Sequence, residues 1–219
     1  MNTFMNWLAN SFVPKSNKIL SKPWISALGS TMQKVIPFIL TGSVIFLYNV
    51  LVSFFPSLPD LGVISDFSFG IISLIVAFTI ANQCMEKLGH PSYMINAGIA
   101  SIGVFLMVAI PIGEDADSIS ALMNHLSASG IAVAMITGLF TSIIFHLWAK
   151  LHFLKDSSIP DFVSSWINTV VPNLISLGSI MVMVKLMDVN VYAAIISIFT
   201  PLIQIGQTLD RKSTRLNSS

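Results

Sequence analysis

The stretch IPDFVSSWINTVVPNLISLGSIMVMVKLM, residues 159–187, decides the fold of this chain. Its last 21 residues, 167–187, carry a single charge, Lys185. About twenty apolar residues, at about 1.5 Å each, are enough to cross a hydrocarbon core about 30 Å thick. Pro160 favours a non-helical start, and Trp166 suits the boundary between membrane and water. The stretch therefore predicts a short aqueous loop followed by a transmembrane helix.

The composition of the whole chain points the same way. Hydrophobic residues make up 54% of the sequence and charged residues 10%, whereas soluble domains usually contain about 25% charged residues. The charges fall between apolar runs, so we predict an all-α fold, a polytopic membrane helix bundle. The net charge is +1, and no basic patch is interleaved with aromatic residues, so nothing indicates nucleic-acid binding.

Five apolar runs are predicted to be transmembrane helices, at residues 31–55, 67–86, 93–111, 131–148 and 167–187. Pro172, early in the fifth run, removes one backbone donor and predicts a bend or a loosened turn close by. Small residues in the third and fourth runs would let helix backbones approach closely, within one chain or between two. They are Ala97, Gly98, Ala100, Ser101, Gly103, Gly138 and Ser142.

These runs divide the chain into four parts. Residues 1–28 combine an amphipathic helix, ended by Pro14, with a basic segment, and residues 29–188 form a five-helix scaffold. Residues 189–210 form an amphipathic connecting helix near the outer interface, with a sixth span as the alternative. Its apolar stripe is Val191, Ile195, Ile198, Leu202 and Ile205. Residues 211–219 change abruptly in composition, and we interpret them as a non-native tail or, alternatively, as a native solvated one.

Lysines are distributed unequally between the two ends of the predicted bundle. Cytoplasmic loops of membrane proteins carry an excess of Lys and Arg. We therefore expect the N-terminus on the cytoplasmic side and the acidic gap after the third run on the other side. Only Lys185 lies at the outer end, whereas the inner end has Lys15, Lys18, Lys22, Lys34, Lys87, Lys150 and Lys155.

The histidines and an acidic run are the ionisable candidates for a site. An ionisable group inside a span suggests a functional role by default. For His146, however, the nearby residues Trp148 and Lys150 favour a position at the membrane interface. The other histidines fall in loops, and no pair has the spacing of a helical metal site. The acidic run is interpreted as solvated. These loop residues are His90, His125, His152, Glu114, Asp115 and Asp117.

Amide side chains within the spans need hydrogen-bond partners in hydrocarbon. We favour bonds between helices over substrate contacts for Asn49, Asn82, Gln83, Asn96 and Asn173. The single cysteine, Cys84, excludes an internal disulfide and indicates an inert core thiol. The sequence contains neither a Gly-x-Ser-x-Gly elbow nor a phosphate-binding Gly-x-x-x-x-Gly-Lys motif. We therefore assign no catalytic, cofactor-binding or metal-binding residue.

The order of three segments resembles the membrane subunit, enzyme IIC, of the lactose/cellobiose family of the bacterial phosphoenolpyruvate-dependent sugar phosphotransferase system. The segments are PFILTGS at 37–43, IPDFV at 159–163 followed by Ser165-Trp166 and Val171-Pro172, and TPLIQ at 200–204. The resemblance covers residues 24–209. The loop departs from the family pattern, which usually has a second proline near Ser165 and a basic residue where this chain has Ile159.

The resemblance implies a bacterial cell-membrane permease that takes up an oligosaccharide such as cellobiose, chitobiose or lactose. Cytoplasmic phosphotransferase subunits would phosphorylate the sugar, so this subunit would not itself be an enzyme. Family members are about twice as long and homodimeric, with a scaffold half and a transport half that contacts the sugar. This chain resembles only the N-terminal, scaffold half, so we expect no substrate-binding residue in it.

Two other classes of protein remain open from the sequence. An unrelated secondary transporter or channel subunit would need paired broken helices or charges inside the membrane. A membrane-embedded enzyme would need His, Asp and Glu side chains clustered at one depth. The spans as predicted carry charges only near their ends, which favours neither class.

Overall fold

The structure is a computed structural model, and it describes residue 10 and residues 12–55, 57–110, 116–151 and 160–201. Across this part of the chain the fold is helical, and no strand occurs in it. The helices are α2 (Val13–Leu20), α3 (Pro23–Val52), α4 (Gly62–Asp66), α5 (Ile72–Lys87), α6 (Met94–Ala109), α7 (Ala116–Leu126), α8 (Ile131–Leu151), α9 (Asp161–Met181) and a last helix, Val191–Pro201.

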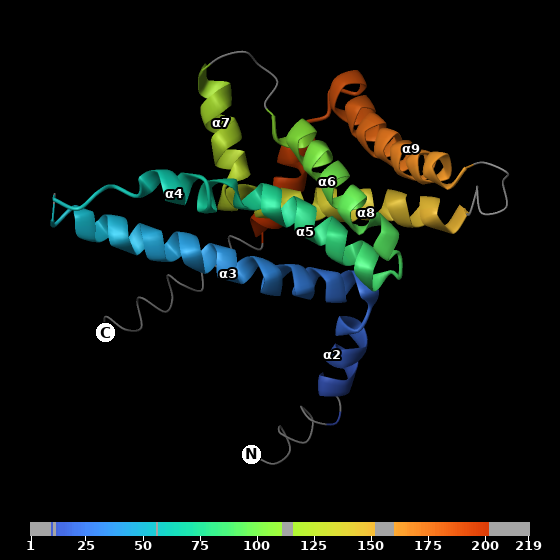
Figure 1. The fold of residues 1–219 in the computed structure, drawn as a ribbon, viewed down its shortest axis with the longest axis horizontal. Coiled ribbons are helices and arrows are strands. Elements are labelled where there is room, and N and C mark those ends of the chain that lie inside the picture. The colour runs from blue at the N-terminus through green and yellow to red at the C-terminus, as the bar shows by residue number, and fades with distance from the viewer. Residues whose placement is uncertain (1–9, 11, 56, 111–115, 152–159, 202–219) are drawn as a thin grey trace.

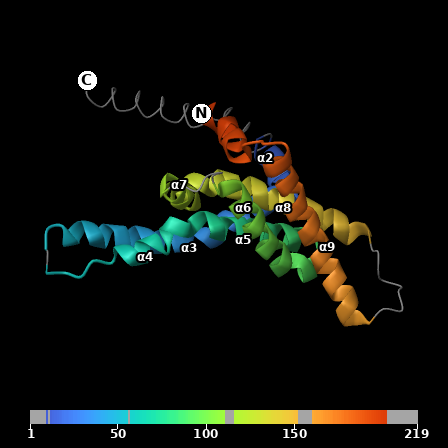
Figure 2. The same ribbon diagram turned by 90° about the horizontal axis from the view of Figure 1, so that it is seen from above.

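Five helical segments are long and apolar enough to cross a membrane, which confirms the prediction of an all-α polytopic bundle. They are Pro23–Val52, Gly62–Lys87, Pro91–Ala109, Ala128–Leu151 and Phe162–Leu186. Helix α5 is central, because it packs against α3, α6 and α8. Helix α9 packs on α6 and α8 and crosses the others obliquely (Figures 1 and 2).

Small residues allow α5, α6 and α8 to lie close together. A Cβ atom on Gly98 would come within 2.6 Å of the Phe78 ring. A Cβ atom on Gly138 would collide with the Ile80 side chain and lie 3.1 Å from the carbonyl oxygen of Ala77. The Ser101 hydroxyl donates a 2.7 Å hydrogen bond to that same carbonyl. Gly98, Ser101 and Gly138 therefore serve packing within the chain.

Several helix boundaries differ from those predicted, and prolines explain most of the differences. Helix α3 begins at Pro23 rather than at residue 31, and Pro14 lies in the first turn of α2. Pro160 directly precedes α9, so residues 161–166 are helical and not part of a loop. Proline suits the start of a helix because its missing N–H would have no partner there.

One expectation about the loops is also corrected. The acidic gap between the third and fourth spans contains an eleven-residue helix, α7. Helix α9 continues through Pro172, and the widened π-helical turn lies about ten residues later, at Val182–Leu186. A bend of the helix axis at Pro172 stays a prediction. Loss of one N–H costs the helix a single hydrogen bond, and the neighbouring turns retain theirs.

Asn190 directly precedes the last helix, and its side-chain oxygen accepts a 2.9 Å hydrogen bond from the backbone N–H of Ala193. Ile195 is buried and Ile198 is 71% exposed, and Val191, Ile195 and Ile198 line one apolar pocket together, as the predicted stripe requires. Tyr192, Ile196 and Phe199 also pack against the core. Residues 1–9 and 202–219, which include most of the predicted N-terminal helix and the tail, lie outside the described residues.

We predict that Gly138→Ala destabilises the protein by about 1–3 kcal/mol, the usual range for overpacking a core, because the new methyl group meets Ile80 and the Ala77 carbonyl. Thermal unfolding in detergent, followed by fluorescence-detected size exclusion, measures the change. Gly178→Ala is the matched control: no atom lies within 4 Å of the point that its Cβ would occupy, and alanine favours a helix by about 1 kcal/mol over glycine. Equal melting temperatures for the two variants would contradict this packing.

Candidate functional site

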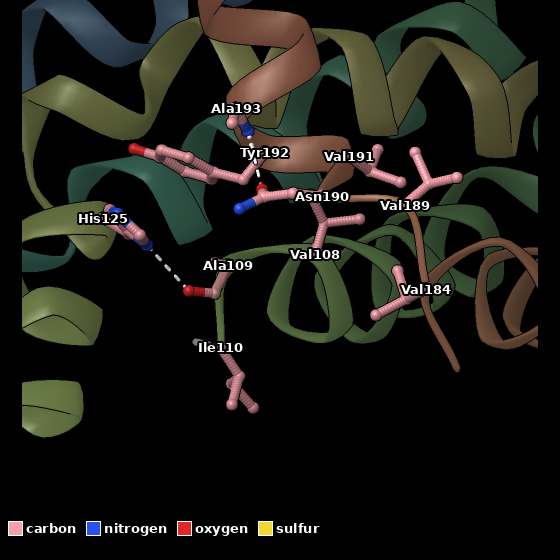
Figure 3. A pocket seen from close by; sticks show the side chains of 10 residues that line it. All are labelled: Val108, Ala109, Ile110, His125, Val184, Val189, Asn190, Val191, Tyr192 and Ala193. Atoms are coloured by element: carbon pink, nitrogen blue, oxygen red, sulfur yellow. Dashed lines mark hydrogen bonds between the residues drawn. The ribbon is translucent and has the colours of Figure 1, made fainter. Parts of the chain in front are cut away.

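A pocket of about 390 Å³ opens at the end of the bundle where α6 ends and the last helix begins. Figure 3 shows how its side chains converge from separate parts of the chain. The pocket is mostly aliphatic, with His125, Asn190 and Tyr192 as its polar side chains. Its other lining residues are Val108, Ala109, Ile110, Val184, Val189, Val191 and Ala193.

His125 ties three elements together at this pocket. Its Nδ1 lies 2.7 Å from the carbonyl oxygen of Ala109, at the end of α6. Nδ1 must therefore donate the hydrogen bond, and a neutral His125 carries its proton there. The imidazole also stacks on Tyr192, with ring centroids 3.7 Å apart and planes 21° apart. His125 thus joins α7 to both α6 and the last helix.

The remaining polar groups of the pocket also have structural partners. Burial raises the pKa of the Tyr192 phenol, and a hydrogen bond with Ser129 opposes that rise. The phenol therefore stays protonated at neutral pH. The oxygen of Asn190 caps the last helix. This pocket offers a stacked aromatic surface, but its histidine and asparagine are already engaged, and no nucleophile with a neighbouring base is among its described lining residues.

A second histidine site lies at the opposite end of the bundle. His90 Nε2 and His146 Nδ1 are 3.0 Å apart, and the Trp24 ring meets His146 edge-on with centroids 6.0 Å apart. Gly89, with a φ of +79°, reverses the chain after α5 and brings His90 back towards α8. Sequence reasoning missed this pair because 56 residues separate the two histidines.

The predicted interhelical amide bonds are found in one clear case. Asn96 Nδ2 donates to Thr169 Oγ1 at 3.3 Å and links α6 to α9. Asn49 accepts a 3.1 Å bond from the backbone N–H of Leu61, the N-cap residue of α4, and so links α3 to the start of α4. The buried side-chain oxygen of Asn173 has no hydrogen-bond partner among the described residues.

Gln83 instead belongs to a chain of contacts that joins α5 to α3. Its amide donates to Glu86 at 2.7 Å and to Asn82 at 3.3 Å. Glu86 in turn pairs with Lys34 of α3 at 3.6 Å. Both charged side chains are about half exposed, so the ion pair itself adds little stability. Its main effect is to hold Glu86 where the buried Gln83 can bond to it.

The other candidates add no chemical site within the described residues. No group of three or more His, Cys, Asp or Glu side chains among them could hold a metal ion. Cys84 is a buried, free thiol, as the prediction of a core cysteine requires. Glu114, Asp115 and His152 lie outside the residues that the structure describes, and nothing is described of the Asp117 side chain.

The apolar spans and the internally bonded polar groups define a multi-pass α-helical membrane protein. The chain is 26% identical over 197 residues to the "Putative permease IIC component YwbA" of Bacillus subtilis (strain 168), and the match covers 80% of this chain. It covers 44% of that relative, so the chain spans less than half of the relative's length. No family model and no solved structure matches the chain. The chain is therefore similar to part of a protein whose name describes a permease component.

We predict that His125→Ala loosens α7, because the variant loses both the hydrogen bond to Ala109 and the stack on Tyr192. Together these contacts are worth about 1–2 kcal/mol, so amide hydrogen exchange in α7 should accelerate roughly tenfold. Met123→Ala is the control, because Met123 lies on the same helix with its side chain 49% exposed. Unchanged exchange in the His125 variant would show that other contacts hold α7.

Proposed function

We propose that this chain is the scaffold half of a sugar permease of the phosphotransferase IIC type, in the lactose/cellobiose family. The observation that carries the proposal is the match to YwbA over four fifths of the chain, on a fold with five candidate spans. The segments at 37–43, 159–163 and 200–204 supply the family resemblance. The transported sugar would be an oligosaccharide such as cellobiose, chitobiose or lactose.

The described polar groups support a scaffold role rather than a sugar site. A sugar site presents convergent polar groups that are free to bind hydroxyl groups. Here Ser101 bonds Ala77, Asn96 bonds Thr169 and His125 bonds Ala109. Since these groups are used for packing, the sugar contacts would lie in the part of a longer permease that this chain does not match.

The ends of the helices support one orientation in the membrane. Lys22 precedes α3, Lys87 ends α5, and Lys150 lies in the last turn of α8. The contact between His90 and His146 places the ends of α5 and α8 together. By the excess of positive charge on cytoplasmic loops, this end faces the cytoplasm of a bacterial cell. The soluble phosphotransferase subunits would meet the permease there.

We predict that a cysteine at position 87 is labelled only from the cytoplasmic side and a cysteine at position 188 only from outside. Both substitutions, Lys87→Cys and Asp188→Cys, replace exposed residues in a Cys84→Ala background. A membrane-impermeant maleimide applied to intact cells should modify position 188, and position 87 should react only after lysis. The reverse pattern would overturn the orientation.

We predict that the purified chain forms a homodimer but binds no sugar by itself. Calorimetry with cellobiose, chitobiose and lactose should give no saturable heat, because the polar side chains that would have to bind hydroxyl groups are used for packing. Single-molecule photobleaching in liposomes at low protein density should show two copies per particle. A full-length permease of the same family serves as the positive control.

The two measurements separate two kinds of failure. Saturable binding at micromolar affinity would reject the division into scaffold and transport halves and leave the permease assignment intact. A single copy per liposome, for protein that elutes as one folded species, would reject the scaffold's role in dimerisation.

A further inference from the structure

The N-terminal part of the chain is unusually one-sided in charge. The first acidic residue of the sequence is Asp60. Before it stand four lysines and no arginine: Lys15, Lys18, Lys22 and Lys34. Three of these four lie within or beside α2, just before the first candidate span. Clusters of basic residues next to a span are attracted to anionic lipid headgroups.

Helix α2 is amphipathic, and its apolar side is exposed. At about 100° per residue, its apolar positions fall on one side of the helix and Lys18 falls on the other. Three apolar residues of the helix are 45–58% exposed: Val13, Ile19 and Leu20. None of the three belongs to either buried core cluster or packs against one. An exposed apolar side that lies outside the core is what an interfacial helix presents to lipid.

The backbone between α2 and α3 directs α2 away from the first candidate span, at the end of that span where lipid headgroups would lie. Lys22 has an extended backbone, with φ −63° and ψ 133°, and Pro23 then starts α3. An extended residue before proline separates two helices sharply. In Figure 1, α2 turns away from the amino-terminal end of α3, across the direction in which α3, α5 and α8 run. Trp24, one residue into α3, suits the same interface.

We propose that α2 is an in-plane membrane helix that binds the anionic lipid surface at the lysine-rich end of the bundle. The side chains of Ile19 and Leu20 enter the acyl region, and Lys18 and Lys22 reach phosphate groups of anionic headgroups. The charge complementarity argues for lipid over a second copy of this chain, because an identical α2 would bring lysines towards lysines. The proposal depends on membrane insertion and not on sugar transport.

The test places an environment-sensitive fluorophore on α2 of the full chain in nanodiscs. Ile19→Cys carries the label in a Cys84→Ala background, and Ser21→Cys, on the polar side of the helix, carries it in the control. The discs contain phosphatidylcholine alone, or equal parts of phosphatidylcholine and phosphatidylglycerol. Lipids with a nitroxide near the headgroup report contact between the label and lipid by quenching.

We expect the label at position 19 to shift to shorter wavelength and to be quenched by the nitroxide lipids, more strongly in the anionic discs. The label at position 21 should show neither effect. Each lysine near the surface is worth about a factor of five in binding. Lys18→Gln with Lys22→Gln should therefore weaken the bound state of α2 by about twenty-five-fold, whereas Lys185→Gln, at the other end of the bundle, should not change it.

Three outcomes would overturn the proposal. A label at position 19 that keeps its emission in water would show that α2 does not enter the membrane. A shift to shorter wavelength without nitroxide quenching would place α2 against protein, either the bundle or a second copy. Equal quenching in neutral and anionic discs, with no effect of the two lysine substitutions, would remove the role of lipid charge.

Discussion

The close approach of α5, α6 and α8 is the constraint on which the rest of the structure depends. Gly138 lies against Ile80 and Ala77, and Gly98 lies against Phe78. In lipid, apolar side chains gain little by leaving the acyl chains, so tight van der Waals contact and hydrogen bonds must hold helices together. The Ser101 bond to the Ala77 carbonyl supplies such a hydrogen bond at the same contact. Around this centre α3 and α9 have room for larger, more exposed apolar side chains.

The polar side chains between the helices also need partners within the protein, because an unpaired polar atom in a low dielectric is costly. Asn96 bonds Thr169, Gln83 bonds Glu86, and His90 lies against His146. The contacts of Asn96 and His90 restrict how two segments can slide past one another, whereas the bond between Gln83 and Glu86 lies within α5. The buried oxygen of Asn173 is an exception, with no partner among the described residues.

Hydropathy was sufficient to predict the five spans, because length and apolar content are local properties of the sequence. Prolines lie at two helix starts that were not predicted: Pro23 begins α3 eight residues before the predicted span, and Pro160 directly precedes α9 where a loop was predicted. The contact between His90 and His146 depends on how α5 and α8 pack, and no local pattern in the sequence encodes it. The stacking of His125 on Tyr192 could not be predicted for the same reason. The only signal for it in the sequence is that each ring lies near the end of a helix.

The two ends of the bundle are built for different surroundings. At the pocket end, His125 and Asn190 direct their polar atoms back to the chain's own backbone, which ties α7 to α6 and caps the last helix. At the other end, the lysines that flank α2, α5 and α8 are exposed or lie at helix ends. A cation near a membrane surface keeps its hydration and gains from anionic headgroups, whereas the buried amides of the spans require protein partners. The lysine-rich end therefore presents charge at its surface, while His125 and Asn190 at the pocket end are bonded to the chain's own backbone.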